Sequence, residues 1–494
     1  MNLEGPRAVG IRQEPIARRG DNCWRTETSP SSAFLVDGEA YYGALARTLP
    51  LARERIWIIG WDFNPWIELT PGSGGPNLGS FLRGLVEECD TLEIRMLIWA
   101  FGPLYSGKSL KIFSEHEWAD HPRIFLRFDR GRPLRASHHQ KIVCVDDVTA
   151  FVGGMDLTLA RWDSCEHLPH NPLRKKPAGE EYGPVHDVQA LVTGAAAGAI
   201  SEIAAKRWRQ ATEESVDAGK IEKPVLWPPT LKPDLSDCQV AIAQTRPAGL
   251  RWRGRHEAAA LTFDALAAAR RHLYIETQYL ASFKVADRLA RLLRKPDGPE
   301  ILIILTKSSR GIVEHFVMAH NRNRLLRRLK RADVHDRLRV MYPTTESADG
   351  STKEILVHSK LIIVDDAFLR IGSSNLNNRS EGLDTECDVA FEAADDQQHA
   401  AVAGLRNRLL AEHVGSDADT VAREIARTGS MLAAVDKLNV GARRLNSLDV
   451  DPQNGMTTPL PGTQLLDPPA PMQPLRALRR WWRACISWIS GWKR

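Results

Sequence analysis

The chain of 494 residues is long enough for two or three domains, each with a sizeable hydrophobic core. Its residues are 43% hydrophobic and 26% charged, as in an ordinary globular protein, and the net charge of +5 is too small to indicate a nucleic-acid partner by itself. No run of about 18 apolar residues occurs, which excludes a membrane-spanning helix.

The seven cysteines are scattered, odd in number and without a CxxC pair. We therefore expect neither a disulfide framework nor a zinc site, and a reducing compartment fits best. The first 20 residues lack an apolar core and do not resemble a secretory signal. We expect a cytoplasmic protein or one at the periphery of a membrane, although a specialised secretion machine would need no ordinary signal peptide.

Short apolar runs alternate with longer helical patterns along the chain, which predicts an α/β architecture. The runs are rich in Ile, Val, Leu and aromatic residues, as is typical of buried strands. The expected strands are 55–63, 92–101 and 123–129 in the first half, and 272–280, 300–309 and 337–343 in the second.

The two halves repeat one another in order and in spacing. From Arg55 to His139 is 84 residues, and from His272 to His358 is 86. We therefore predict two tandem units, each a mixed β-sheet flanked by helices, related by a pseudo-twofold axis with the active site at their interface. The expected divisions are a lead-in at 1–32, a first unit at 33–222, a Pro-rich connection at 223–235 and a second unit at 236–413.

Three further segments are expected after the second unit. Residues 414–447 have a helical pattern, with Ser416 or Asp417 as a cap, and 448–473 resemble a flexible tether. Residues 474–494 form a basic amphipathic pattern that can lie in a bilayer interface or dock on the protein's own surface. The candidates for membrane contact are Arg476, Arg480, Arg483, Trp481, Trp482 and Trp488.

A short motif, HxKxxxxD, ends the strand pattern of each half. Residues i and i+2 of a strand point to the same face, so His139 projects with Lys141 and His358 with Lys360. A lysine ammonium suits the non-bridging oxygens of a phosphoryl group, and an imidazole can attack phosphorus or carry a proton. Two such pairs facing each other would supply a nucleophile and a general acid.

Asp146 and Asp365 complete the two motifs. Four apolar residues separate each aspartate from its lysine, which places it at the far end of the strand, in a turn. We count both aspartates with the catalytic motifs but interpret them as structural or supporting groups rather than as nucleophiles. One such motif could arise by chance, whereas two in equivalent places of a repeat indicate a function.

The two motifs match the signature of the phospholipase D superfamily, and the resemblance runs from about residue 33 to 413. The chain most resembles the eukaryotic-type phospholipases D, through "FLVDGEAYY", "GWDF", "GGMDLTLARWD", "HDVQALVTGAAA", "IETQYL" and "IGSSNLNNRSEGLDTE". It has no room for their C2 or PX/PH modules beside this core, so we expect no calcium-dependent recruitment to lipid.

The resemblance implies a role for each motif residue, and no metal. His139 would attack phosphorus to give a phosphohistidine, and His358 would protonate the leaving alcohol and then activate water or another alcohol. In the first half the position that matches Asn375 is Asp156, which has no amide. The groups expected to hold the phosphate oxygens are Lys141, Lys360, Asn375 and Ser373.

Carboxylates orient the histidines in this family, and three supporting candidates follow from the resemblance. Asp187 and Glu386 each stand just before an apolar strand, and Asp163 belongs to the "RWD" of the long motif. For Asp187 and Asp163 the alternative is a buried ion pair or a cap.

The implied activity is hydrolysis of glycerophospholipid head groups to phosphatidic acid, with some transfer to alcohols. The implied partners are phospholipid at a membrane surface and water or a primary alcohol as acceptor, without a cofactor or an obligatory protein partner. The alternatives are cardiolipin synthase-like phosphatidyl transfer, a nuclease or other phosphodiesterase of the same superfamily, and an inactive lipid-binding scaffold. The scaffold is disfavoured because neither motif has lost its His or Lys.

Overall fold

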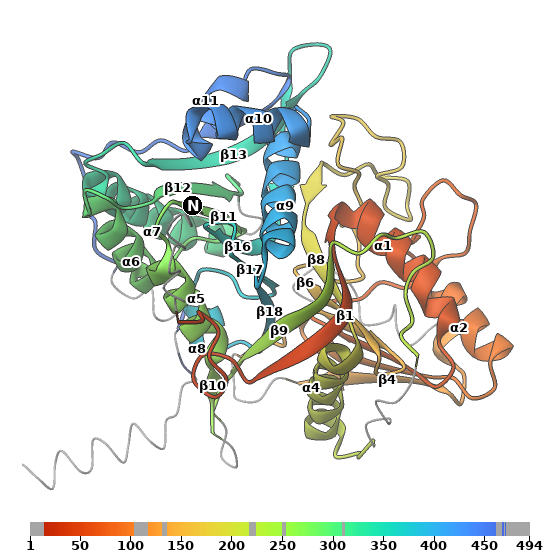
Figure 1. Ribbon diagram of the computed structural model, residues 1–494. Coiled ribbons are helices and arrows are strands. Elements are labelled where there is room, and N and C mark those ends of the chain that lie inside the picture. The colour runs from red at the N-terminus through yellow and green to blue at the C-terminus, as the bar shows by residue number, and fades with distance from the viewer. Residues whose placement is uncertain are drawn as a thin grey trace, which may run out of the picture.

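Strands and helices of a mixed α/β fold fill both halves of the computed structural model (Figure 1). The structure describes residues 14–102, 117–130, 136–216, 224–248, 253–308, 312–460, 467–468 and 470. The expected α/β class is confirmed. The six expected strands begin within one residue of where the sequence placed them.

The first half carries most of the N-terminal elements. Their bounds are β1 Arg25–Val36, α1 Asp37–Thr48, β2 Arg55–Gly60, α2 Leu78–Glu88, β3 Glu93–Trp99, β4 Ile124–Asp129, β5 Ile142–Val145, β6 Thr149–Gly153, β7 Val185–His186, β8 Val188–Thr193 and α4 Gly194–Thr212, with 3₁₀ turns at Leu49–Leu51 and Glu117–Ala119.

The second half follows the same plan. Its bounds are β9 Leu235–Arg246, β10 Arg255–His256, α5 Glu257–Ala268, β11 His272–Thr277, α6 Phe283–Arg294, β12 Glu300–Leu305, α7 Ile312–Ala332, β13 Leu338–Glu346, β14 Thr352–Glu354, β15 Leu356–Val357, β16 Lys360–Val364, β17 Phe368–Gly372, α8 Asn378–Gly382, β18 Glu386–Glu392 and α9 Asp396–Val414, followed by α10 Ala418–Thr428, α11 Met431–Leu438 and β19 Arg443–Ser447.

Strand order is the same in the two halves. The first half reads β4-β3-β2-β5-β6-β8-β1, and the second reads β13-β12-β11-β16-β17-β18-β9. In each, three parallel strands are followed by antiparallel ones, the first of which begins at the motif lysine (β16) or directly after it (β5). The repeat seen in the sequence is therefore also a repeat of topology.

The two sheets are joined edge to edge, whereas the sequence suggested a separate sheet in each unit. Strand β1 pairs antiparallel with β9 from Arg25↔Ile242 to Ser32↔Leu235, and β1 and β9 lie side by side at the centre of Figure 1. The 12 residues of β1 extend beyond β8, and pairing with β9 satisfies backbone groups that an edge strand would leave open. One core cluster contains buried side chains of both halves, among them Trp57, Trp208, Tyr274 and Phe391.

The C-terminal part differs from the sequence expectation. Asp417 does cap α10, accepting the N–H of Thr420 at 2.8 Å. Residues 451–458, expected to belong to a free tether, lie along α7, whose arginines donate to their backbone carbonyls. The arginines of α7 thus have acceptors within the chain. Beyond residue 470 the chain lies outside the described residues, which include no helix long and apolar enough to cross a membrane.

Candidate active site

Each motif begins beside a strand of the opposite half. The N–H of His139 donates to Thr385 O at 3.1 Å, and the N–H of Thr385 donates to Ser137 O at 3.0 Å. On the other side β7 and β15 form a two-stranded parallel ladder, and the N–H of His358 donates to His186 O at 2.8 Å. These backbone hydrogen bonds place His139 beside Glu386, the residue after Thr385, and His358 beside Asp187, the residue after His186.

Each motif histidine faces a carboxylate that comes from the opposite half of the chain. His139 Nδ1 lies 3.0 Å from Glu386 Oε2, and His358 Nδ1 lies 2.8 Å from Asp187 Oδ2. Both carboxylates are fully buried, while the side chains of His139 and His358 are 18% and 7% exposed. A carboxylate on Nδ1 fixes the imidazole so that Nε2 is the atom left for chemistry.

Burial controls the charge of the two carboxylates. Burial, opposed by hydrogen bonds from Ser373 and Ser380, raises the pKa of Glu386 to about 7. The two hydroxyls lie 2.5 and 2.7 Å from the Glu386 oxygens. Burial, opposed mainly by Lys360, raises the pKa of Asp187 to about 6.

The lysines have different partners in the two halves. Lys141 Nζ lies 3.2 Å from Asp156 Oδ2 and donates to His139 O at 2.8 Å. Lys360 Nζ donates to Gln278 Oε1 at 3.3 Å and to the carbonyl of its own motif histidine. The first lysine thus has a carboxylate beside it and the second a neutral amide.

The charges of the two motifs act on one another. Burial, then Lys141 and Lys360, lowers the pKa of His139 well below its usual range. Burial, then Lys360, Arg161, Lys141 and His139, does the same to the pKa of His358. Both imidazoles therefore favour the neutral form without substrate. Burial, opposed by Asp187, also lowers the pKa of Lys360 to about 7, so an anion in the site would favour its charged form.

Asp146 and Asp365 hold backbone rather than reacting groups. Asp146 accepts the N–H groups of residues 53, 54 and 55 at 2.8–2.9 Å, and Asp365 accepts those of residues 270, 271 and 272 at the same distances. Both have positive φ in the turns that follow β5 and β16. The geometry agrees with the structural interpretation of these two residues.

The loop after β17 places Ser373 and Asn375 differently from one another. The hydroxyl of Ser373 donates to Glu386 and accepts the N–H of Cys387 at 3.0 Å, so it has no proton left to donate to phosphate. We therefore reassign Ser373 from phosphate binding to support of Glu386. The N–H of Asn375 donates to Ser380 Oγ at 3.1 Å, while its buried side-chain oxygen has no hydrogen-bond partner among the described residues.

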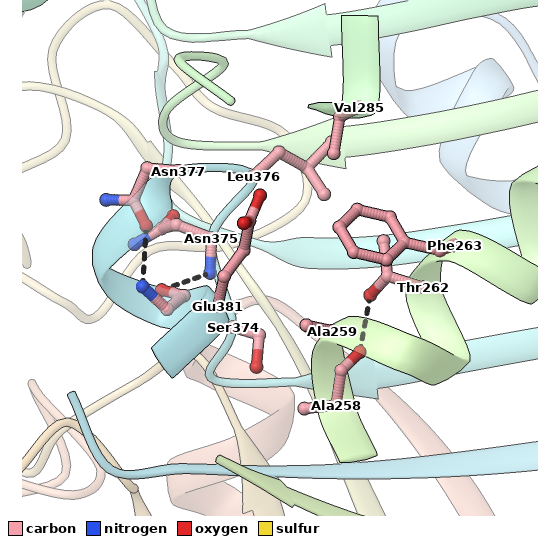
Figure 2. Close-up of a pocket in the computed structure, with 11 residues that line it drawn as sticks. Ala258, Ala259, Thr262, Phe263, Val285, Ser374, Asn375, Leu376, Asn377 and Glu381 are labelled. Carbon is pink, nitrogen blue, oxygen red and sulfur yellow. Dashed lines mark hydrogen bonds between the residues drawn. The ribbon is translucent and has the colours of Figure 1, made fainter. Parts of the chain in front are cut away.

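A small pocket lies on one side of this loop (Figure 2). Its walls come from α5 and α6 on one side and from the Asn375 loop and α8 on the other. None of the four motif His and Lys residues lines it. Its lining residues are Ala258, Ala259, Thr262, Phe263, Val285, Ser374, Asn375, Leu376, Asn377, Ser380 and Glu381.

The comparisons with known proteins agree with this geometry. Residues 263–403 match a family model described as the PLD-like domain of cardiolipin synthase. Phospholipase D A of Dictyostelium discoideum is 24% identical over 460 residues, and phospholipase D1 of Saccharomyces cerevisiae is 24% identical over 499 residues. These alignments cover 78% and 80% of this chain. Over most of its length the chain is similar to proteins named phospholipases D.

A solved structure shares the fold. Phosphatidylserine synthase of Haemophilus influenzae superposes with a TM-score of 0.54 at 14% identity, over 77% of this chain and 88% of that one. The alignments with the two curated relatives cover only 36% and 29% of those proteins, so this chain spans about a third of their length. The shared fold leaves the reaction of this chain as a separate question.

Asp163 does not reach either motif. Its fully buried carboxylate accepts from Arg174 at 3.0 Å and faces His167 Nδ1 at 2.8 Å. It also accepts the N–H groups of Ser164 and Val185, each at 3.0 Å. This is the buried ion pair that the sequence left open as an alternative.

Several residues near the motifs were not singled out from the sequence. Gln278, Arg161 and Ser380 lie within quoted motifs of the superfamily resemblance, which was the signal available for them. Among the described residues, side chains that could hold a metal ion form two groups outside the motifs, Asp37 with His167, His186 and Glu412, and His186 with Glu276 and His413. The membrane-contact candidates at 476–488 lie outside the described residues.

Proposed function

We propose that this chain is a phospholipase D-type phosphodiesterase that hydrolyses glycerophospholipid head groups to phosphatidic acid. The observation that carries the proposal is the exchange of carboxylates between the halves, Glu386 on His139 and Asp187 on His358. That arrangement gives two oriented imidazoles and two lysines in one site, which suits an anionic phosphodiester. The curated relatives at 24% identity are named phospholipases D.

In the first step, His139 Nε2 attacks phosphorus and a P–N bond forms as the P–O bond to the head group breaks. The Nδ1–H of His139 keeps its hydrogen bond to Glu386, whose negative charge offsets the positive charge that develops on the imidazole ring. Lys141 and Lys360 hold the non-bridging oxygens. His358 gives its Nε2 proton to the departing alcohol oxygen.

His358 needs a proton before it can act as an acid, although its pKa is low without substrate. A bound phosphodiester brings a negative charge next to the imidazole, which raises its pKa and favours proton uptake. In the second step water gives a proton to His358 Nε2 as its oxygen attacks phosphorus. The P–N bond then breaks, which releases phosphatidic acid and restores both imidazoles.

A second candidate reaction uses the same covalent intermediate. An alcohol in place of water would take the phosphatidyl group, and the matching family model and the solved structure are named for cardiolipin synthase and phosphatidylserine synthase. We place hydrolysis first because the relatives that match most of this chain by sequence are named phospholipases D, at 23–24% identity against 14% for the synthase structure.

The decisive experiment supplies vesicles of phosphatidylcholine, phosphatidylethanolamine and phosphatidylglycerol, with and without a primary alcohol, and follows the lipid products by mass spectrometry. We expect phosphatidic acid, plus phosphatidyl-alcohol when alcohol is present. The variant His139→Ala should lose both by at least about 10⁴-fold because it lacks the nucleophile. The control His170→Ala, a change in a 68%-exposed side chain outside the site, should keep full activity.

A second variant separates the two steps. His358→Ala with a nitrophenyl phosphodiester, whose leaving group needs no acid, should accumulate a covalent adduct on His139, seen as a mass increase of the intact chain. Products that form only with alcohol would favour the transferase. No lipid turnover by the wild-type chain would contradict the proposed reaction and direct the same variants to nucleic-acid phosphodiesters.

A further inference from the structure

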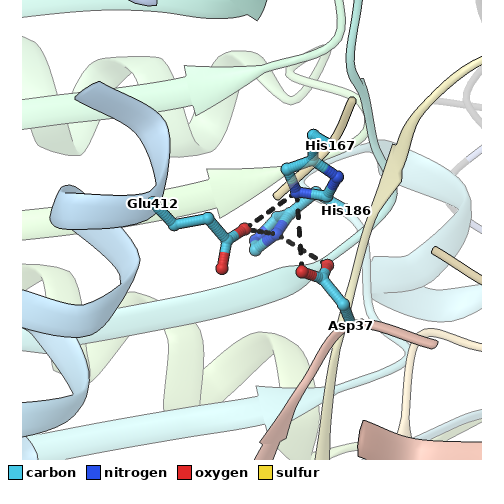
Figure 3. A group of neighbouring side chains, drawn as sticks. All are labelled: Asp37, His167, His186 and Glu412. Carbon is cyan, nitrogen blue, oxygen red and sulfur yellow. Dashed lines mark hydrogen bonds and ion pairs between the residues drawn. The ribbon is translucent and has the colours of Figure 1, made fainter. Parts of the chain in front are cut away.

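Four buried side chains from distant parts of the sequence meet beside the active site. Asp37 begins α1, His167 lies in the loop after β6, His186 ends β7 and Glu412 lies near the end of α9. Figure 3 shows both carboxylates pointing toward the same two imidazoles. Their ligand-type atoms all lie within 4.8 Å of one another.

The inward-facing atoms of these four side chains are close enough together to share a single ion. Glu412 Oε1 lies 3.0 Å from His167 Nε2 and 2.6 Å from His186 Nδ1. Asp37 Oδ1 lies 3.1 Å from His186 Nδ1, and Asp37 Oδ2 lies 3.5 Å from His167 Nε2. Four ligands at about 2.0–2.2 Å from one tetrahedral ion are about 3.3–3.6 Å apart, so an ion at the centre requires the closest of these atoms to separate by up to about 1 Å.

Two of the atoms have no hydrogen bond despite these short distances. Asp37 Oδ2 and His186 Nδ1 are buried and lie within ion-pair distance of neighbouring groups, but among the described residues neither has a partner with hydrogen-bond geometry. A buried carboxylate oxygen and a buried ring nitrogen without well-aligned hydrogen bonds cost free energy unless something else binds both. A cation between them removes both costs.

The second layer of contacts is the one that metal-binding histidines have. His167 Nδ1 lies 2.8 Å from Asp163 Oδ2, and His186 Nε2 lies 2.9 Å from Glu276 Oε2. Each imidazole can thus donate its other N–H to a carboxylate, which leaves Nε2 of His167 and Nδ1 of His186 as lone pairs facing the cluster. The four inward atoms are then two neutral nitrogens and two carboxylate oxygens.

Backbone conformation and charge point the same way. Asp37 has φ +66° and His167 φ +45°, in a region that Asp and His adopt more often than most residues other than glycine, at a modest cost that the surrounding structure or a ligand offsets. A divalent ion would balance the charges of Asp37 and Glu412, while Arg174 balances Asp163.

We propose that Asp37, His167, His186 and Glu412 bind one zinc ion that fastens the two halves together beside the active site. Two imidazoles and two carboxylates without an open position suit a closed, structural zinc site. The ion would take no part in phosphoryl transfer. No short sequence motif marks this site, because its four ligands are spread over most of the chain and none is a cysteine.

The location explains what the ion would hold in place. The backbone carbonyl of His186 accepts the N–H of His358 at 2.8 Å, and the backbone N–H of Asp37 donates to the carbonyl of Asp187 at 2.8 Å. Two zinc ligands therefore contact, through backbone, the catalytic histidine of the second half and the carboxylate that orients it. Glu412 adds a ligand from the second half, so the ion spans the boundary between the halves.

The test measures metal in the full chain, purified without a polyhistidine tag and dialysed against metal-free buffer. Elemental mass spectrometry should find about one zinc per chain. Removing zinc with a chelator should lower the melting temperature by roughly 5 °C or more, and adding Zn²⁺ should restore it. Co²⁺ in place of Zn²⁺ should give the intense visible absorption of a tetrahedral site.

Variants identify the ligands. Asp37→Asn and His167→Gln should reduce bound zinc to about a tenth or less of the wild-type amount. The control His272→Gln removes another buried histidine, paired with Asp366 far from the cluster, and should keep its zinc.

Two results would overturn the proposal. One is a wild-type chain that holds no zinc, takes up neither Zn²⁺ nor Co²⁺ and melts at the same temperature with chelator, which would mean that protons on the imidazoles hold the cluster. The other is loss of zinc in His413→Gln but not in His167→Gln, which would move the ion to the neighbouring group of His186, Glu276 and His413.

Discussion

The Glu386 carboxyl group is fully buried, and its charge weakens the folded state. Its pKa is raised from 4.5 to about 7 in the folded protein, so the folded chain binds this proton more tightly than the unfolded chain. Stability from this group is therefore complete below pH 4.5, falls as the pH rises through the window from 4.5 to 7, and stays low above it. Acid strengthens the fold here, in contrast to an ordinary salt-bridged carboxylate.

The variant Glu386→Gln removes this pH dependence. The free energy of unfolding of the variant, minus that of the wild type, should rise by about 3 kcal/mol between pH 4.5 and pH 8, because only the wild type has to bury a charge. Denaturant titrations of both proteins at the two pH values measure the difference. In the control Glu180→Gln, where the side chain is 67% exposed, the difference should not change with pH. A constant difference for Glu386→Gln would show that its folded pKa is not raised.

The variant Glu386→Gln also affects the reaction, because it removes the charge beside His139. Gln at this position can still accept from His139 Nδ1, but it cannot offset positive charge on the ring during attack. Asp187 makes the same contact with His358, so each half supplies the carboxylate that orients the imidazole of the other half. The pairing follows from the backbone ladders at 137–139 with 385 and at 356–358 with 184–186.

At the scale of elements, a motif aspartate in the turn of each hairpin, β5–β6 or β16–β17, binds backbone N–H groups at the start of a neighbouring strand. Asp146 lies in the turn between β5 and β6 and accepts three backbone N–H groups at the start of β2. Asp146→Ala leaves those donors unpaired and puts alanine at φ +50°, so we expect a loss of roughly 3 kcal/mol in the free energy of unfolding. Asp146→Asn keeps one acceptor oxygen and tolerates this φ, and should lose less.

Activity per folded molecule distinguishes a fastening role from a chemical one. We expect Asp146→Ala to retain activity within about 10-fold at a temperature where it is fully folded, since Asp146 holds the start of a strand and not the imidazole. Circular dichroism fixes the folded fraction, and lipid turnover gives the rate. A folded variant with activity as low as that of His139→Ala would place Asp146 in the reaction itself.

The elements that the sequence revealed are those with local signals. Apolar runs and the repeated spacing located the strands around both motifs, and Asp417 was recognisable as a cap. The pairing of β1 with β9 had no such signal, because it joins segments about 200 residues apart that only the folded chain brings together. The same holds for the contact of residues 451–458 with α7, where a basic helix face turned out to bind backbone carbonyls.

Residue types alone also left the site incomplete. The resemblance picked out Glu386 and Asp187 as orienting groups, but which histidine each one holds depends on how two distant strands cross. The sequence indicated that Ser373 belongs to the site, but the spacing of residues could not show that its hydroxyl donates to Glu386. Asp37, His167, His186 and Glu412 are spread over most of the chain, and no short motif could have joined them.

At the scale of the molecule, the two halves share one sheet and one core, so we expect them to unfold as one cooperative unit. Phe34 of β1 and Phe391 of β18 meet edge to face with ring centroids 5.1 Å apart, and one cluster of buried residues contains both. A site built from both halves needs this, because a small shift of one half would separate each histidine from its carboxylate.

Phe391→Ala tests this cooperativity. The change removes a side chain that is 1% exposed, and should cost about 3–5 kcal/mol. Since the core is shared, unfolding should remain a single transition at a lower midpoint, and hydrogen exchange measured by mass spectrometry should accelerate by about 100-fold or more in both β5 and β16. Val334→Ala, at a 64%-exposed position, is the control and should leave exchange unchanged. Faster exchange in β16 alone, or two separate transitions, would mean that the halves fold independently and that the active site joins two units rather than lying within one.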